Sequence, residues 1–464
     1  MSLPTHLQQA LTYAHHNQGR HLDELHRFLR IPSISTLPEH KADTLAAAEW
    51  LAENMSQAGL ENVRIIPTRR HPLIYADWLH AGPEMPTVLI YGHYDVQPPE
   101  PVALWETPPF SPTVRDDFLY ARGASDDKGQ TLIQVKAVAS YLQTNGRLPV
   151  NVKFIIEGEE ESGGENLAQF IPANPELLRA DVAVISDTAM FSPEQPSIVY
   201  GTRGICYSFL DVTGPDHDLH SGSFGGGVNN PLNALAHLIA QLKDGDGRIL
   251  IPGFYDRVRP LNAEERSLLA RNPLDPEAWL AETGAPRLWG EPEYSLVERL
   301  GARPTLDVNG IIGGYTGDGA KTVLPARAHA KLSMRLVPDQ DPEEIAGLLA
   351  TYVASIAPPT VKVTVSYVHG APASVTDLKI PAMRAAAAAY TNVFGREPIY
   401  TREGGSLPVV GHFQRHLGLE TILMGFGLPT DRIHSPNERF YLPNFYRGIE
   451  TIIHFLAEYA AVAG

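Results

Sequence analysis

The strongest constraint on the fold of this chain comes from four short runs of apolar residues. The runs are continuous rather than alternating, and they are TVLIYG (87–92), NVKFII (151–156), DVAVIS (181–186) and ETILMGFG (420–427). A continuous apolar strand is typical of a parallel sheet whose two faces are both covered by helices. A helical pattern over 131–146 lies between two of the runs, and this alternation predicts an α/β domain with a mainly parallel sheet.

Helical patterns also occur near both ends of the chain. Residues 5–30 carry leucines and histidines at helical spacing and predict one amphipathic helix. Residues 44–59 predict a second helix that ends at Gly59, because glycine is common just after the last helical residue. Residues 446–463 predict a C-terminal helix that returns to the α/β core.

The middle of the chain has a different pattern. From about residue 201 to about 373, apolar and polar residues alternate in the segments 206–214, 328–338 and 361–370. Alternation predicts a sheet with one exposed face. A chain of 464 residues is longer than one hydrophobic core usually serves. We therefore expect an α+β domain over 205–375, inserted into an α/β domain made of 1–204 and 376–464.

Composition excludes several classes of partner. The net charge is −16, from 37 basic and 53 acidic residues without a basic cluster, which argues against nucleic acid or an anionic membrane surface as the main partner. No apolar run reaches the roughly 18–20 residues of a membrane span, and the N-terminus lacks a signal-peptide pattern. The single cysteine, Cys206, excludes an internal disulfide and is typical of a cytoplasmic protein.

Metal-binding side chains follow the apolar runs. They are His93 and Asp95 in GHYDVQP, the glutamates of EGEEESGG (157–164), Asp187, His434 in LPTDRIHSPNE, and Asp126 and Asp127 in YARGASDDKG, before a predicted helix. Ligands of open α/β sheets bind at the carboxyl ends of the strands, so five segments should meet at one edge. Imidazole and carboxylate are ligands of zinc and related divalent metals, and a cation would offset the repulsion among the glutamates.

Each segment has a simpler interpretation when it is taken alone. Asp126 and Asp127 could cap a helix, Asp187 could belong to a turn, and His434 could lie on the surface. The glutamates of EGEEESGG could form a solvated loop. The occurrence of all five segments at predicted strand ends favours a metal site, and two metals there would share a carboxylate and activate a bridging water.

A family resemblance covers nearly the whole chain. The motifs GHYDVQP, RGASDDKG, EGEEESGG, SDT and HSPNE, in this order, resemble those of the M20 family of di-metal peptidases. The similarity is greatest to its dipeptidase branch, which includes carnosinase-like and cysteinylglycine dipeptidase-like enzymes. It continues through YGTRGICY, DLHSG, GDGAKTVLPARAHAKLSMRLVP and REGGSLP. The resemblance implies an α/β catalytic domain with an inserted dimerisation, or lid, domain.

The resemblance implies two divalent metal ions and their ligands. Asp126 would bridge the two ions. Glu161 and His434 would complete the shell of one ion, and His93 and Asp187 that of the other. Zinc is the first expectation for both ions, with manganese and cobalt as alternatives.

The resemblance also implies how the glutamates divide their roles. Glu160 would be the general base, and Asp95 would orient the ring of a ligand histidine. The pair before Ser162 is Glu160–Glu161, which sets the register. Glu159 stands where relatives often have methionine, so an ambiguity of one residue remains at this point.

Residues of the middle segment and of REGGSLP (402–408) would contact the substrate. By resemblance, His220 reaches the active site from the partner subunit of a homodimer, and Arg335 binds the C-terminal carboxylate of a small peptide. His369 and Ser406 would be further contacts, and the glycines 404–405 would allow close approach of the backbone. Without the resemblance, Arg335 could simply occupy the exposed face of a strand, and His220 could cap a turn.

The implied activity is hydrolysis of dipeptides, or of short peptides with a free C-terminal carboxylate, by a metal-bridging water that Glu160 activates. An alternative on the same scaffold is an N-acyl-amino-acid deacylase or a carboxypeptidase. A further alternative is a metal-binding relative without catalysis, which would lack a ligand or the base. Those positions are all filled in this chain.

Overall fold

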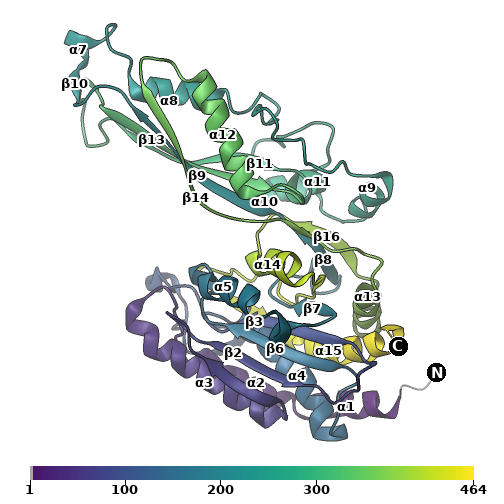
Figure 1. Cartoon of the computed structure of the whole chain (residues 1–464). Helices are drawn as coiled ribbons and strands as arrows, with labels where there is room; N and C mark the ends of the chain where they lie inside the picture. The colour runs from purple at the N-terminus through teal and green to yellow at the C-terminus, as the bar shows by residue number, and fades with distance from the viewer. Residues whose placement is uncertain (1–3, 464) are drawn as a thin grey trace. The chain divides into compact units, whose positions relative to one another are not determined.

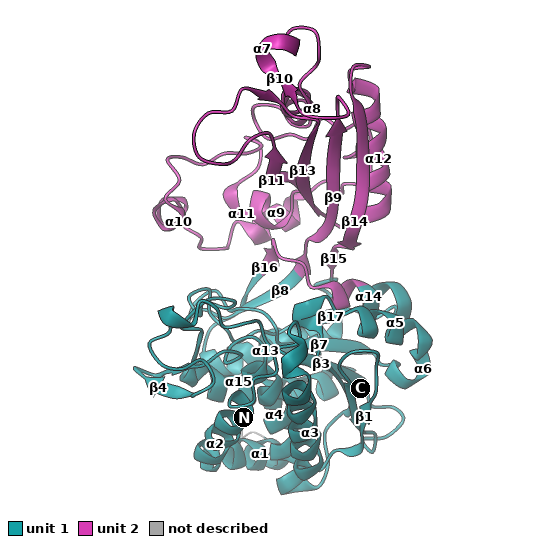
Figure 2. Ribbon diagram, turned by 90° about the vertical axis from the view of Figure 1, so that its left-hand side faces the viewer, with its two compact units in different colours: residues 1–200, 376–400, 412–464 teal, residues 201–375, 401–411 magenta. Residues whose placement is uncertain are grey.

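A computed structural model describes residues 4–463 of the chain, which form two compact units (Figure 2). Unit 1 contains Met1–Tyr200, Thr376–Tyr400 and His412–Gly464, and unit 2 contains Gly201–Val375 and Thr401–Gly411. The sequence prediction placed residues 401–411 with the α/β domain. The structure groups them with unit 2, where Arg402 forms an ion pair with Glu265 and Ser406 accepts a hydrogen bond from Arg335.

Most strands of the largest sheet belong to unit 1. This mixed sheet has the strand order β1-β2-β6-β3-β7-β17-β8-β15, and β16 also pairs with β8. The strands are β1 (Glu61–Ile66), β2 (Leu73–Trp78), β3 (Thr87–His93), β6 (Asn151–Glu157), β7 (Val182–Ile185), β8 (Ser197–Thr202), β15 (Ser374–Val375), β16 (Ile399–Glu403) and β17 (Thr421–Leu423). The neighbours β6, β3, β7 and β17 run parallel, whereas β1, β2 and β8 are antiparallel to their partners. The α/β class is thus confirmed, with antiparallel strands flanking the parallel centre.

Helices cover this sheet (Figure 1). They are α1 (Thr5–His16), α2 (Gln18–Leu29), α3 (Lys41–Ala58), α4 (Lys128–Asn145), α5 (Glu165–Ala173), α6 (Pro175–Leu178), α13 (Pro381–Phe394), α14 (Pro408–Leu417) and α15 (Leu442–Ala463). Helix α4 packs on β3, α3 packs on β1 and β2, and α1, α4 and α13 all contact α15. The C-terminal helix therefore returns to the core as the sequence predicted.

Three local predictions meet different outcomes. The helix over 44–59 is confirmed as α3, and Gly59 ends it with a φ of 99°. The single helix over 5–30 is wrong, because Asn17 separates α1 from α2 and its Nδ2 donates to the Tyr13 carbonyl at 2.8 Å. The run 420–427 is a strand only over Thr421–Leu423, since Gly425 then passes so close to Thr188 that a Cβ would lie 2.1 Å from its carbonyl oxygen.

Unit 1 also contains several smaller elements. They are β4 (Thr113–Arg115), β5 (Phe118–Tyr120), β18 (Arg439–Tyr441) and the short 3-10 helices η1 (Pro38–His40), η2 (Val102–Leu104) and η3 (Glu160–Ser162). β5 pairs with both β4 and β18, so it brings the segment before α4 next to the segment that follows His434.

Unit 2 contains an antiparallel sheet with the order β11-β13-β9-β14. Its strands are β9 (Gly204–Thr213), β11 (Thr305–Gly313), β13 (Arg327–Leu336) and β14 (Lys362–Ala371). Along β9 and β13 every second residue is buried, as alternation predicted. The buried face packs with α8 (Pro231–Ala240) and α12 (Pro342–Ile356) in one hydrophobic core.

The remaining elements of unit 2 are short. They are β10 (Leu219–His220), β12 (Val323–Leu324), α7 (Ser221–Phe224), α9 (Ala263–Leu269), α10 (Pro276–Thr283) and α11 (Leu296–Gly301). β10 pairs with β12, which joins the DLHSG segment to the segment just before β13. Asp275 and Ser295 cap the N-termini of α10 and α11, and their side chains accept hydrogen bonds from backbone N–H groups of the first turn.

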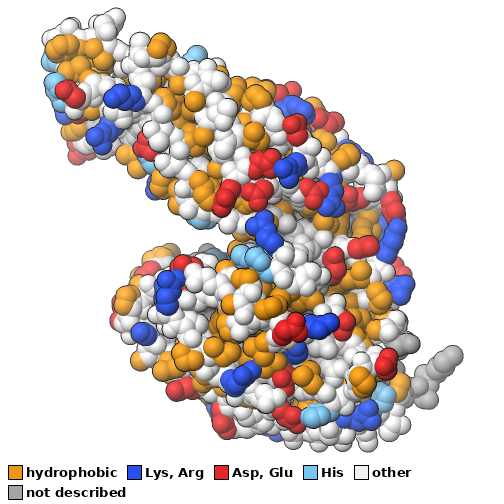
Figure 3. All heavy atoms as spheres, viewed as in Figure 1, with side chains coloured by type: hydrophobic (Ala, Val, Ile, Leu, Met, Phe, Trp, Pro, Cys, Tyr) orange, Lys and Arg blue, Asp and Glu red, His pale blue; other side chains and the backbone are white. Residues whose placement is uncertain are grey.

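The surface carries charges of both signs. On the face in Figure 3, acidic and basic side chains are interspersed with apolar ones over both units. Among residues 4–463, no helix combines the length and the apolar character needed to cross a bilayer.

A buried ion pair holds two loops together in unit 1. The side chains of Arg122 and Glu438 are 1% and 0% exposed, and Arg122 Nη1 lies 2.7 Å from Glu438 Oε2. Glu438 also accepts hydrogen bonds from the backbone N–H groups of Gly123, Ser125 and Asp126, at 3.0, 3.1 and 3.2 Å. One carboxylate therefore fixes the loop that precedes α4.

Replacing Arg122 with methionine should destabilise unit 1 strongly. Arg122→Met leaves Glu438 buried without its countercharge, which costs about 3–5 kcal/mol in the free energy of unfolding. Urea unfolding of the metal-free protein measures this change. Arg179→Met is the control, since Arg179 is 80% exposed in its pair with Glu176 and should change stability little. Equal effects of the two variants would contradict the role given to Glu438.

Candidate metal centre

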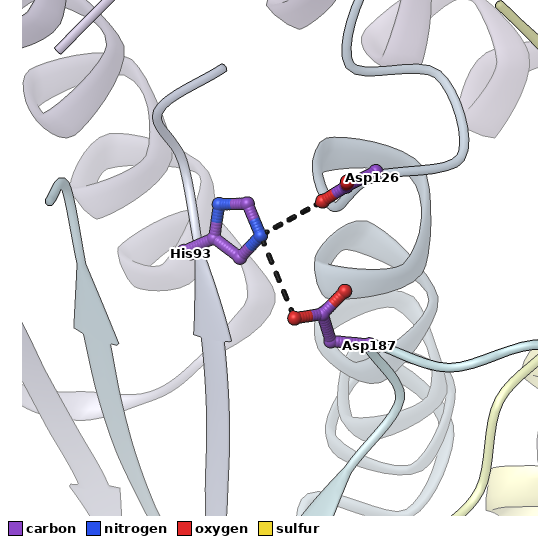
Figure 4. A group of neighbouring side chains, drawn as sticks. All are labelled: His93, Asp126 and Asp187. Carbon is purple, nitrogen blue, oxygen red and sulfur yellow. Dashed lines mark hydrogen bonds and ion pairs between the residues drawn. The ribbon is translucent and has the colours of Figure 1, made fainter. Parts of the chain in front are cut away.

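Three side chains meet at the carboxyl edge of the parallel strands (Figure 4). His93 ends β3, Asp187 follows β7, and Asp126 lies in the loop before α4. His93 Nε2 is 3.0 Å from Asp126 Oδ1 and 3.7 Å from Asp187 Oδ2. One ligand atom from each residue lies within 4.8 Å of the others, which is close enough for a common metal ion.

A second group of three shares one member with the first. His434 Nε2 lies 2.9 Å from Asp126 Oδ2 and 3.1 Å from Glu161 Oε2. These three residues also offer ligand atoms within 4.8 Å of one another. The two oxygens of Asp126 thus face two different histidines, and this is the arrangement expected of a carboxylate shared by two metal sites.

The electrostatics of these groups show how strongly the carboxylates repel one another. Burial, and then the charges of Asp127 and Asp126, raise the pKa of Asp187 well above its ordinary value. Burial is also the main cause that raises the pKa of Glu160 to about 7, and Glu161 and Asp126 add to it.

The pKa values of the two histidines also rise, which favours their charged form. Hydrogen bonds to Asp126 and Glu161 raise the pKa of His434 to about 10. Burial lowers the pKa of His93, but hydrogen bonds to Asp126 and Asp95 outweigh it and raise this pKa well above its ordinary value. Without a metal ion, protons bound to these acids and histidines offset the repulsion among the carboxylates. A divalent cation could take their place, so the donor set fits two metal ions.

Asp95 is buried beneath both groups. Its Oδ1 lies 3.3 Å from Nδ1 of the His93 ring. Its two oxygens also accept hydrogen bonds from the backbone N–H groups of Glu160 and Glu161, at 3.2 and 3.1 Å. Asp95 therefore orients a candidate ligand and holds the start of η3, where the charge of Glu160 interacts with those of His93, Glu161 and Asp126.

The other two glutamates of EGEEESGG make structural contacts that the sequence did not reveal. Glu159 accepts a hydrogen bond from the His71 backbone N–H at 2.8 Å, and both its oxygens accept from Asn166 Nδ2, at 2.6 and 2.7 Å. Glu157 accepts from the Tyr91 hydroxyl at 2.7 Å, and burial raises its pKa to about 8. The four glutamates thus have separate surroundings.

Sequence reasoning also missed two anchors of the His434 loop. Asp431 Oδ2 accepts hydrogen bonds from the Ser125 hydroxyl and the Leu428 backbone N–H, both at 2.8 Å. Glu438 holds the loop from its other side, as described above. His434 has a φ of 58°, a left-handed conformation that costs energy in a residue with a side chain. The sequence signal that could have identified these anchors is that Asp431 and Glu438 both lie in LPTDRIHSPNE, on either side of His434.

The predicted substrate contacts all belong to unit 2. Arg335 Nη1 donates to the Ser406 hydroxyl at 2.8 Å, so the structure brings these two residues together. His369 on β14 stacks on Tyr207 of β9, with ring centroids 5.2 Å apart. His220 is exposed at the end of β10, and its Nδ1 accepts a hydrogen bond from the Gly222 N–H at 3.0 Å. This contact is the turn cap that its simpler interpretation predicted.

Arg203 supports the glycine segment beside Ser406. Its Nε donates to the Gly404 carbonyl at 3.2 Å, and its Nη1 donates to the Arg303 carbonyl at 3.3 Å. A Cβ at residue 404 would lie 2.9 Å from the backbone carbonyl oxygen of Leu300, so glycine suits this close approach. Burial, and then the charge of Arg335, lower the pKa of Arg203 to about 10.

The chain is similar to known proteins over most of its length. Residues 89–458 match the model of peptidase family M20/M25/M40. The chain is 32% identical to the Cys-Gly metallodipeptidase DUG1 of Saccharomyces cerevisiae, over 94% of each chain. It is 34% identical to the Beta-Ala-His dipeptidase of Rattus norvegicus, over 83% of this chain and 80% of the relative.

A solved structure extends the similarity to the fold. The M20 family metallo-carboxypeptidase Sso-CP2 from Sulfolobus solfataricus is 35% identical to this chain and superimposes with a TM-score of 0.84. The match covers 95% of this chain and 99% of that structure. From its family model, its curated relatives and its fold, the chain belongs to peptidase family M20/M25/M40.

Proposed function

We propose that this protein is a dinuclear metallodipeptidase that hydrolyses dipeptides, or short peptides with a free C-terminal carboxylate. The observation that carries the proposal is the pair of three-residue groups that share Asp126, with the Glu160 backbone held by Asp95 next to Glu161. The metallodipeptidase and dipeptidase names of relatives that align over most of the chain support the substrate class.

The metal ligands we propose are the members of those groups. Asp126 would be shared by two ions, His93 and Asp187 would complete one site, and Glu161 and His434 would complete the other. Mixed nitrogen and oxygen ligation suits zinc first, with manganese or cobalt as alternatives. When bound, the ions polarise the scissile carbonyl and lower the pKa of a water that they share.

Glu160 is the proposed general base. It follows Glu159, which is tied to His71 and Asn166, and precedes Glu161, which belongs to a metal group. The hydrogen bond from its backbone N–H to Asp95 holds it beside the ligands. Its carboxylate accepts a proton from the attacking water and later donates that proton to the nitrogen of the leaving amine.

In unit 2 we propose that Arg335 binds the substrate carboxylate. A guanidinium group suits a planar anion, and the Ser406 hydroxyl fixes its orientation. His369 is a further proposed contact. We also propose a homodimer in which His220 acts from the partner subunit, with unit 2 as the dimerisation domain and unit 1 as the catalytic domain. The presence of a single cysteine favours a cytoplasmic location.

A substrate panel tests the proposed activity. We expect turnover of dipeptides with a free carboxylate, and little turnover of N-acetyl amino acids or of dipeptide amides. A carboxypeptidase is the second candidate, because Sso-CP2 carries that name at 35% identity. Release of C-terminal residues from longer peptides, at rates equal to dipeptide hydrolysis, would favour it. Turnover of N-acetyl amino acids alone would refute the dipeptidase assignment.

Replacing the base should separate catalysis from metal binding. Glu160→Gln should lower kcat by about 10²–10⁴-fold while both ions remain bound, because the amide cannot accept the proton. Steady-state kinetics and elemental analysis of the same sample measure the two effects. Undiminished turnover would exclude Glu160 as the base.

The neighbouring glutamate provides a matched control and a prediction of its own. Glu159→Gln replaces a carboxylate that accepts hydrogen bonds from Thr68, His71 and Asn166, so it should cost about 1–3 kcal/mol of stability. Urea unfolding should show this loss, whereas Glu160→Gln should unfold nearly as the wild type does. A large loss of kcat in Glu159→Gln with unchanged stability would instead shift the base by one residue.

Removing the proposed carboxylate anchor should act on the substrate and leave the metals in place. Arg335→Met should lower kcat/KM for dipeptides by about 10- to 100-fold, since hydrogen bonds to a charged group contribute about 1.5–3 kcal/mol. The same variant should leave the slow hydrolysis of dipeptide amides nearly unchanged. An equal loss on both substrate types would contradict recognition of the carboxylate.

A further inference from the structure

One amide side chain contacts Glu161 and has no role in the mechanism described above. Gln97, in GHYDVQP, donates from Nε2 to Glu161 Oε2 at 2.7 Å and to the Glu161 carbonyl oxygen at 3.3 Å. The same Oε2 lies 3.1 Å from His434 Nε2. The oxygen that Gln97 holds is therefore the one next to another member of the second metal group.

The backbone that carries Gln97 is fixed independently of Glu161. The Val96 N–H donates to the Ser33 carbonyl at 3.0 Å, and the Ser33 hydroxyl donates to the Tyr94 carbonyl at 2.6 Å. Val96 and Tyr94 are both buried. The amide group of Gln97 thus projects from a rigid segment, which is a requirement for orienting another side chain.

Asp95 and Gln97 hold Glu161 from one segment. Asp95 Oδ2 accepts from the Glu161 backbone N–H at 3.1 Å, while Gln97 contacts the carbonyl and the carboxylate of the same residue. The first metal group has no such contact with Gln97, because both hydrogen bonds that this amide donates go to Glu161. The effect of Gln97 should therefore be selective for the second group.

The chemistry of an amide suits this position. A carboxylate oxygen has two acceptor sites, so Oε2 can accept from Gln97 and still face His434. A lysine or arginine at position 97 would place a competing positive charge beside a cation site. A carboxylate there would add to the repulsion among Glu161, Asp126 and Glu160. A glutamine donates a hydrogen bond without changing the charge.

We propose that Gln97 is a positioning residue that orients Glu161 toward the ion held with Asp126 and His434, and so sets the affinity of that one site. The inference rests on the proposed metal centre. It predicts that the two ions of one active site respond differently to a change at residue 97, because donors outside the ligand shell typically contribute a factor of about 10–100 in metal affinity.

The test is a titration of metal-free protein with Zn²⁺ in competition with a chromophoric chelator. Gln97→Met keeps the size of the side chain and removes the donor. It should weaken one Zn²⁺ by about 10- to 100-fold and leave the other within about twofold. His434→Ala identifies the affected ion, since that variant should lose the same Zn²⁺.

Gln143→Met is the matched control. Gln143 lies near the C-terminal end of α4, the end of that helix away from Asp126, and donates to the Gln57 carbonyl at 3.1 Å. This variant should bind both ions as the wild type does. Thermal unfolding of the metal-free variants measures any general loss of stability, which a merely structural role of Gln97 would produce without a selective effect on one ion.

Two outcomes would overturn the inference. One is unchanged affinity for both ions in Gln97→Met, and the other is an equal loss at both sites. The substrate panel tests the proposed function separately, because the affinity for Zn²⁺ is measured without any turnover of substrate. If the wild type binds a single Zn²⁺, the two-metal proposal fails. In that case the affinity of Gln97→Met for the single Zn²⁺ is compared with that of the wild type, and an unaltered affinity refutes the inference.

Discussion

Repulsion among carboxylates held out of water is the constraint on which the rest of unit 1 depends. Asp126 lies at the centre of it, with one oxygen toward His93 and the other toward His434. The surrounding acids that do not face this centre each accept protein donors. Asp95 accepts two backbone N–H groups, and Glu438 accepts three together with an arginine. Only a scaffold with many such donors can bring so many acids together.

The sheet supplies the geometry in which these donors converge. Because β6, β3, β7 and β17 are parallel, the segments that follow them leave at the same edge. His93 and Glu157 are register partners at the ends of two of these strands. Ligands on short loops after rigid strands are held more firmly than ligands on long loops. The exception is the longer His434 loop, which Asp431 and Glu438 anchor at either end.

Much of the candidate site was predictable from short motifs. Asp95, His93 and Asp187 stand directly at the ends of apolar runs, so their meeting follows once the strands are parallel. Glu159 could not be assigned in the same way, because its partners are a backbone N–H 88 residues away and an asparagine that no motif marks. The break at Asn17 was also missed, since the helical spacing of apolar residues continues across it.

The sequence by itself determined the fold class, the two kinds of sheet and the segments that carry the chemistry, because these depend on the period of apolar residues and on residues adjacent in the chain. The tertiary structure alone decided which glutamate faces the metal groups and which is bound by the scaffold. It also decided that Gln97 contacts Glu161 and that Glu438 holds Asp126. These outcomes depend largely on hydrogen bonds between residues far apart in the chain, such as 64 positions for Gln97 and Glu161 and 312 for Asp126 and Glu438. Such pairings arise only when the strands and loops have packed.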